Sequence, residues 1–201
     1  MEFQPPPEVL EHRKPEHDVH PLLYSRWSSR AMSGEAVTEQ ELGPLFEAAR
    51  WAPSSFNAQP WRFVYSLRDD ENWTAYLEAI FEKNRAWAQD AGALILLVSR
   101  KNFEHNEQPA LTHGFDAGAA WQNLALEGAR KNFVIHAMQG FDHEKARAMA
   151  GVPEGFETQI MIAVGRPGDK ARLPEMFREK DFPSGRKSLS ELVMRGKFSA
   201  G

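Results

Sequence analysis

Residues 38–67 read TEQELGPLFEAARWAPSSFNAQPWRFVYSL, and this stretch decides the fold class. Thr38 and Glu41 form a capping box, in which each side chain can bond an unpaired backbone N–H of a first helical turn. The apolar positions that follow recur at helical spacing: Leu42, Leu45, Phe46 and Ala49. Pro53 ends this helix, because a proline disfavours helical backbone in the residue before it. Residues 62–67 then read as a strand, so the stretch predicts a helix, a loop and a strand.

The rest of the chain mixes helices and strands in the same way. Helices are expected over residues 71–85, 115–130 and 142–150, strands over 93–98, 134–135 and 159–164, and a turn over 165–168. The run 93–98, ALILLV, is apolar throughout, which is typical of a strand buried on both faces. Helices and strands that share one core indicate the α+β class, or an α/β three-layer sandwich.

Length and composition favour one domain. The chain has 201 residues, of which 42% are hydrophobic, enough for one sizeable core. Residues 1–20 are charged and proline-rich and read as an arm on the surface or on a partner subunit, and residues 168–201 read as a polar, irregular C-terminal extension. We therefore expect a single domain over 1–201 with these two appendages.

Composition also excludes several functional classes. The net charge of −4 argues against nucleic acid as a partner, because phosphate binding needs clustered Lys and Arg. The absence of cysteine excludes disulfides and thiolate chemistry, and it fits a cytoplasmic protein. No segment approaches the roughly 18 apolar residues that span a membrane. No Gly-rich nucleotide-binding motif, no H-E-x-x-H and no G-x-S-x-G is present, and no metal site is expected.

Residues 26–30 read RWSSR and form the first candidate site. Two arginines four residues apart, with hydroxyls between them, can converge on one dianion, because a guanidinium is a planar fork that matches phosphate oxygens. The alternative is an ordinary solvated helix start with two exposed arginines.

Residues 52–61, APSSFNAQPW, form the second candidate site. Two hydroxyls and two amides lie in a loop that two prolines fix. Neutral donors and acceptors in a fixed shape suit an uncharged polar ring system, such as the pyrimidine edge of a flavin. A polar turn that bonds its own backbone is the other interpretation, and these residues alone leave both open.

The order and spacing of these two segments resemble the nitroreductase family of FMN-dependent oxidoreductases. The resemblance runs from about residue 25 to about residue 193. Its other segments are Asn84 with Trp87, residues 115–124 (FDAGAAWQNL), residues 140–142 (GFD) and residues 186–189 (RKSL). Each segment alone is modest, but their order and spacing are specific. The resemblance implies a central, mostly antiparallel sheet flanked by helices, in an intertwined dimer.

The resemblance implies a role for each matching position at the phosphate. Arg26, Ser28 and Arg30 would hold the FMN phosphate and ribityl chain, joined by Arg186, and Trp27 would contribute through its backbone. The charge balance agrees, because a phosphate of charge near −2 compensates clustered arginines that would otherwise repel one another.

The resemblance also implies contacts to the flavin ring. The loop residues would line the flavin from the other subunit: Pro53, Ser54, Ser55 and Asn57. Asn84 would bond the ring or ribityl edge. The residues near the reactive N5 atom would be Met138, Gln139 and Gly140, with a backbone N–H as donor. No catalytic side chain is certain.

Three features depart from the family's usual pattern. Residues 128–133 read GARKNF where many members have a G-L-G-like segment, and Gln139 stands where an acidic residue often precedes the turn. His136 lies two residues before Met138, close to the expected flavin, but a satisfied structural histidine is the favoured interpretation. These departures bear on the substrate and the electron donor more than on the cofactor.

The implied activity is a two-electron reduction. NADH or NADPH would pass a hydride to FMN, and a nitroaromatic, a quinone or a similar electrophile would then take its place over the same flavin face. A specialised flavin enzyme, such as a dehalogenase or a heterocycle oxidase, is the alternative among enzymes. A non-catalytic flavin-binding protein and an interaction module without cofactor are the alternatives outside enzymes.

A homodimer with FMN at the subunit interface is expected from the spacing of the two segments together with the resemblance. The helix that begins near Thr38, with about 14 residues, would span about 21 Å. Residues 26–30 and 54–57 therefore need not meet within one chain, and in the resembling family they meet across the interface.

Overall fold

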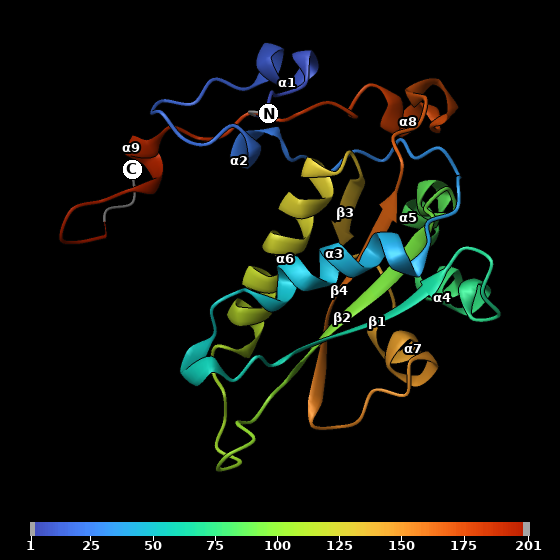
Figure 1. Cartoon of the computed structure of the whole chain (residues 1–201), viewed down its shortest axis with the longest axis vertical. Helices are drawn as coiled ribbons and strands as arrows, with labels where there is room; N and C mark the ends of the chain where they lie inside the picture. The colour runs from blue at the N-terminus through green and yellow to red at the C-terminus, as the bar shows by residue number, and fades with distance from the viewer. Residues whose placement is uncertain (1–2, 199–201) are drawn as a thin grey trace.

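A four-stranded sheet lies at the centre of the computed structural model, which describes residues 3–198 (Figure 1). The strands lie in the order β1 (Trp61–Leu67), β2 (Ala93–Arg100), β4 (Phe156–Gly165) and β3 (Val134–Met138). Every pair of neighbouring strands is antiparallel. The α+β class with an antiparallel central sheet is therefore confirmed.

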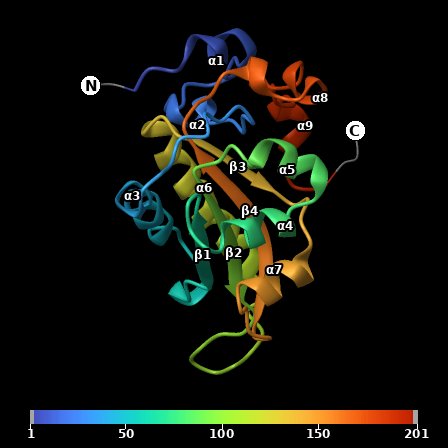
Figure 2. The ribbon, with the colours of Figure 1, turned by 90° about the vertical axis from the view of Figure 1, so that its right-hand side faces the viewer.

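Helices cover both faces of this sheet. One face carries α3 (Glu39–Arg50) and α6 (His113–Arg130), and the other carries α4 (Trp73–Ala79), α5 (Glu82–Ala88) and α7 (His143–Met149) (Figure 2). The central strand β2 sends alternate side chains into the two apolar clusters that result. Full burial of each such Leu or Ile contributes about 1.5–3 kcal/mol. This two-sided burial is why residues 93–98 are apolar throughout.

Helix α3 begins and ends close to where its sequence predicts. The capping box is present: Glu41 N donates to Thr38 Oγ1 at 3.3 Å, and Thr38 N donates to Glu41 Oε2 at 3.0 Å. The helix ends at Arg50, three residues before Pro53. It buries Leu42, Leu45 and Ala49 and leaves Phe46 half-buried. The helix carries the chain directly into the 52–61 loop.

The single helix predicted over residues 71–85 is wrong, because the structure breaks it into α4 and α5. Ile80 and Phe81, between the two helices, have extended backbone. Their stretch pairs with the 140–142 segment: Phe81 N donates to Gly140 O at 3.1 Å, and Asp142 N donates to Ala79 O at 2.8 Å. Tertiary backbone pairing has therefore overridden a helical pattern of side chains.

The turn predicted over residues 165–168 is also wrong. These residues instead continue beyond β4 alongside residues 31–33. Ser33 N donates to Arg166 O at 3.0 Å, and Gly168 N donates to Ala31 O at 2.9 Å. The helix predicted over residues 142–150 is present as α7. Asp142 caps it by accepting from Lys145 N at 2.9 Å, and Gly151 follows its end with a φ of +61°.

The N-terminal arm and the C-terminal extension lie at the same end of the molecule (Figures 1 and 2). The short elements there are α1 (Pro7–His12), α2 (Leu22–Ser25), η2 (Lys170–Arg172), α8 (Glu175–Arg178) and α9 (Leu189–Leu192). Arg13 Nε donates to Ser184 O at 2.9 Å, and Leu189 N donates to Glu16 Oε1 at 3.0 Å. The N-terminal arm therefore packs on the extension of its own chain. Within residues 3–198, no helix is both long enough and apolar enough to cross a membrane.

Candidate functional site

Three arginines gather where the N-terminal arm, the 26–30 segment and the C-terminal extension meet. The guanidinium of Arg26 lies over the ring of Trp121 at 5.5 Å and donates to Ser28 Oγ at 3.2 Å. Burial lowers the pKa of Arg26, and the nearby charge of Arg186 lowers it further. Burial, Arg186 and Arg26 together lower the pKa of Arg13 to about 10. Among the described residues, none of the three arginines has a carboxylate in an ion pair, so the cluster is uncompensated.

Sequence reasoning missed Arg13, which holds this cluster together. Its side chain donates to three carbonyl oxygens: Ser184 O at 2.9 Å, Tyr24 O at 2.8 Å and Arg26 O at 2.8 Å. These bonds fix the start of the 26–30 segment against the extension that carries Arg186. The local sequence around Arg13 does not indicate this role, because it depends on a contact with a residue 171 positions away.

Arg30 belongs to a different part of the site from Arg26. It lines a cleft of about 530 Å³ together with Lys83, Asn84 and residues 175–177 and 179–180. Its guanidinium lies over the ring of Phe177 at 5.2 Å, and its Nη1 is 3.8 Å from Asp181 Oδ1. The structure therefore brings the predicted Arg30 and Asn84 to one cleft and gives Arg30 a carboxylate partner.

Asn84, which lines this cleft, also contacts the 138–140 segment. Asn84 Nδ2 donates to Gly140 O at 3.3 Å, and a Cβ at position 140 would lie 2.4 Å from the same nitrogen. Position 140 must therefore be glycine for Asn84 to keep this place. Gln139 is exposed, whereas Met138 is only 4% exposed and packs in the core. The side chain of Met138 is therefore unable to contact a ligand, and only its backbone could do so.

His136 has the geometry of a structural histidine. Its Nδ1 is 2.9 Å from Ser29 O, and its ring lies 4.4 Å from the ring of Trp87. Burial lowers the pKa of His136 to about 4. The neutral ring therefore carries its proton on Nδ1, because a carbonyl only accepts, and it donates to the 26–30 segment.

The 52–61 loop has a strained backbone. Phe56, Asn57 and Gln59 have φ values of +51°, +53° and +47°, and side chains other than Asn and Gly rarely adopt this region. Strain of this kind persists only where the surrounding structure fixes it. Ser55 N donates to the buried carboxylate of Asp116 at 3.1 Å, which attaches the loop to the start of α6.

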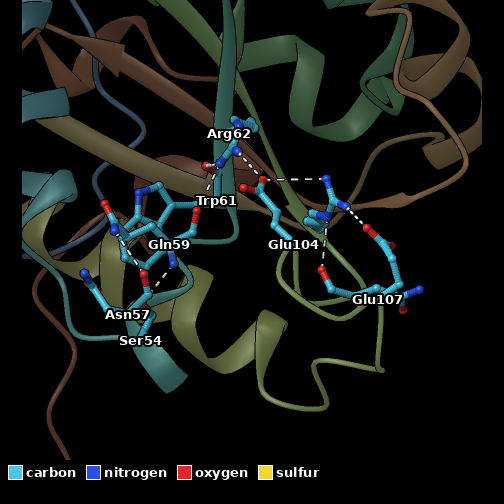
Figure 3. Close-up of polar contacts among 9 residues, drawn as sticks. Ser54, Asn57, Gln59, Trp61, Arg62, Glu104 and Glu107 are labelled. Atoms are coloured by element: carbon cyan, nitrogen blue, oxygen red, sulfur yellow. Dashed lines mark hydrogen bonds and ion pairs between the residues drawn. The ribbon is translucent and has the colours of Figure 1, made fainter.

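Some polar side chains of the loop form hydrogen bonds with the loop's own backbone (Figure 3). Ser54 Oγ accepts from Gln59 N at 3.0 Å, and Gln59 Nε2 donates to Asn57 O at 3.0 Å. Arg62 donates from Nη1 to Gln59 O at 3.0 Å, and its Nη2 forms an ion pair with Glu104 Oε1 at 3.3 Å. The interpretation as a self-bonding polar turn therefore holds for part of the loop, and it is compatible with a ligand at the exposed remainder.

The two candidate segments lie at opposite ends of α6 (Figure 1). The loop contacts Asp116 in the first turn of α6, whereas α2, which leads into Arg26, lies at the other end of this helix. This 18-residue helix is about 27 Å long, and the side chain of Arg26 reaches Trp121, near its middle. In the described part of the chain, no hydrogen bond, ion pair or ring contact joins residues 26–30 to residues 53–57. One chain therefore does not bring the two halves together.

A further polar group resembles a hydrolytic triad but cannot act as one. Ser99 Oγ lies 2.8 Å from His113 Nδ1, and His113 Nε2 lies 3.4 Å from Glu157 Oε2. Ser99 has no exposed surface, and Gln159 Nε2 also donates to its Oγ at 3.0 Å. A nucleophile must reach a substrate, so these contacts serve the packing of β2, β4 and α6. Across residues 3–198, no group of three or more His, Cys, Asp or Glu forms a candidate metal site.

The sheet, its two helical layers and the arginine cluster define an α+β protein with an uncompensated group of arginines at one end. Its residues 23–96 match the model of the nitroreductase family. A solved structure described as the oxidoreductase containing FMN is 36% identical, with 94% of this chain and 97% of that chain covered and a TM-score of 0.90. The chain therefore belongs to the nitroreductase family.

Two curated relatives extend this similarity. An uncharacterized 15.4 kDa protein of Mycolicibacterium smegmatis is 32% identical over 130 residues, which cover 64% of this chain and 86% of the relative. An NADH dehydrogenase of Thermus thermophilus is 27% identical over 219 residues, which cover 92% of this chain and 99% of the relative. The chain thus spans most of the length of each.

Proposed function

We propose that this chain uses NADH or NADPH to reduce small organic electrophiles, such as nitroaromatics or quinones, by two electrons. It is an FMN-dependent oxidoreductase, a class supported by its family, by the FMN of the 36% identical oxidoreductase and by the name of the Thermus thermophilus relative. The observation that carries the proposal is the uncompensated arginine cluster beside the cleft of Arg30 and Asn84.

The residues present fit FMN. Burial lowers the pKa of Arg13 and Arg26 and like charge lowers it further, and a phosphate dianion would relieve this repulsion. Arg26, Ser28 and Arg186 are assigned to the phosphate, with the backbone of Trp27. Arg30 and Asn84 are assigned to the ribityl chain and the ring, because they share the neighbouring cleft.

Bound FMN supplies the hydride chemistry between the nicotinamide and the acceptor. The task of the chain is to bind, orient and exclude water. Gln139 and the backbone N–H of Gly140 are assigned to the N5 side of the ring, where Asn84 holds the 140 turn in place. No acid–base pair is required of the protein, since protons can come from solvent.

A homodimer completes the site in this proposal, with the 53–57 loop of the partner subunit lining the flavin. The separation of the two halves along α6 supports it. Large apolar side chains near the loop support it as well, because Phe56, Leu111 and Phe115 are 83%, 92% and 81% exposed. Exposed apolar surface of this kind marks interaction sites. A cytoplasmic location, which fits the absence of cysteine, belongs to the same proposal.

The first experiment is an anaerobic reduction of the purified protein after it has been soaked in FMN. The proposal expects a yellow protein whose visible flavin absorbance bleaches with NADH or NADPH and returns when a quinone or a nitroaromatic is added. A yellow protein that neither nicotinamide bleaches would be a flavin-binding protein without turnover. A protein that stays colourless would overturn the assignment of the cofactor.

The second experiment tests the shared site by mixing variant chains. Arg26→Ala chains and Asn57→Ala chains are unfolded, refolded together and assayed for bound FMN. If two chains share each site, the mixed dimer has one intact site and one doubly damaged site, so FMN binding partly recovers. Verified mixed dimers without recovery, or an FMN-loaded monomer in light scattering, would exclude the shared site.

A further inference from the structure

A buried carboxylate of the C-terminal extension holds the segment that carries Arg30. The side chain of Asp181 has no exposed surface. Its Oδ2 accepts from Ser29 Oγ at 2.7 Å, and its Oδ1 accepts from Arg30 N at 2.8 Å. The same Oδ1 lies 3.8 Å from Arg30 Nη1. A buried carboxylate is retained only when its charge is paired and hydrogen-bonded, so Asp181 fixes both the position and the charge balance of this segment.

The surroundings leave Arg30 and Asp181 as a balanced pair. His136 packs against the same segment through Ser29 O and is neutral. One partly buried cation and one buried anion therefore face each other here. The other charged residues that line the cleft are exposed to solvent: Lys83, Glu175, Glu179 and Lys180. The cluster of Arg13, Arg26 and Arg186 differs, since no carboxylate of the described residues forms an ion pair with it. The two parts of the site thus differ in net charge although both contain arginine.

We propose that Asp181 is a positioning residue that holds and neutralises Arg30 at the ring end of the flavin site. This inference rests on the proposed function, in which Arg30 and Asn84 lie at the ring. A reduced flavin gains negative charge, and an unbalanced cation beside it would stabilise the reduced form and raise its reduction potential. Asp181 offsets that effect, which keeps the bound flavin a stronger reductant toward the acceptor.

The test is the midpoint potential of the FMN-loaded protein, measured by equilibration with reference dyes. Asp181→Asn keeps the shape of the side chain and removes its charge, so the potential should shift to a more positive value. Glu179→Gln is the matched control, because Glu179 lines the same cleft but is exposed to solvent. Solvent and salt screen an exposed charge, so this control should shift the potential less.

Three further variants show whether Asp181 acts through Arg30. In an Arg30→Gln background, Asp181→Asn should no longer produce the positive shift measured in the wild-type background. Arg30→Gln alone should shift the potential to a more negative value, while Arg30→Lys, which keeps the charge, should shift it less. The Arg30 variants keep the inference testable if Asp181→Asn does not fold.

The outcomes separate this inference from the proposed function. Equal shifts in Asp181→Asn and Glu179→Gln, a positive shift that persists without Arg30, or an unchanged potential in Arg30→Gln would each overturn the role of Asp181 in a protein that still binds FMN. A wild-type protein that binds no FMN would overturn the proposed function itself.

Discussion

The two ends of α6 carry the two candidate halves of the site, and they are built by opposite means. At the C-terminal end, Arg13 reaches Ser184 and Ser29 reaches Asp181, so contacts between distant parts of the sequence place charged groups. At the N-terminal end, residues 54–59 bond one another and adopt a strained backbone. The arginine half therefore depends on charged groups and on contacts between distant residues, whereas the loop half depends on the local backbone conformation.

Acid should destabilise the arginine end through His136, because the folded chain keeps this buried histidine neutral. Burial lowers the pKa of His136 from its ordinary value of 6.5 to about 4 in the folded chain. Between these values the unfolded chain binds a proton that the folded chain does not. Stability is therefore full above about pH 6.5 and falls as the pH drops toward about 4, by on the order of 3 kcal/mol.

Urea unfolding at about pH 7 and about pH 4.5 measures this loss. His136→Gln should show a clearly smaller difference between the two pH values than the wild type, because glutamine keeps a donor but does not titrate. An equal difference in both proteins would show that other groups, and not His136, make the fold sensitive to acid.

Flavin affinity should separate the two halves by chemistry. Arg26→Ala removes a charge-assisted contact of about 1.5–3 kcal/mol, so FMN binding should weaken by about tenfold to a hundredfold. Riboflavin, which lacks the phosphate, should bind this variant and the wild type alike. Asn57→Ala should weaken FMN and riboflavin by the same, smaller factor. Fluorescence titration measures all four affinities, and equal affinity of the wild type for FMN and riboflavin would contradict the phosphate assignment.

The smallest effect tests the strain in the loop. Phe56→Asn places a residue that tolerates a positive φ where phenylalanine has +51°, and this should stabilise the fold by about 0.5–1 kcal/mol. The control is Phe103→Asn, because Phe103 makes the edge-on ring contact with Phe56 at 5.5 Å without a positive φ of its own. It removes the contact and not the strain, so it should not stabilise. Thermal unfolding compares the two variants, and equal shifts would refute the strain.

Sequence reasoning predicted the elements whose signals are local. The capping box of Thr38 and Glu41 and the apolar run 93–98 lie within the elements they define, and both predictions are confirmed. The break at residues 80–81 has no such signal, because it depends on backbone pairing with residues 140–142. Side-chain periodicity describes one element at a time and cannot report a pairing of this kind.

The same limit applies to the candidate site. Residue type and spacing named Arg26 as a candidate, and the family resemblance named Asn84. The structure places Arg26 in the arginine cluster and Asn84 in the cleft. Arg13 and Asp181 were missed, because their contacts lie 171 and 152 positions away in the chain. The positive φ of Phe56 could not be predicted either, because phenylalanine rarely adopts this conformation.

The clamp of Arg13 on Ser184 has a consequence for the order in which the living cell can build this protein. The ribosome makes residue 13 early and residue 184 near the end of translation, and domains generally fold while synthesis proceeds. The sheet can assemble once β4 has emerged. The arm, however, has nothing to close on while residues 181–186 are still inside the exit tunnel. Closure of the arm on the extension is therefore one of the last steps in the folding of this chain.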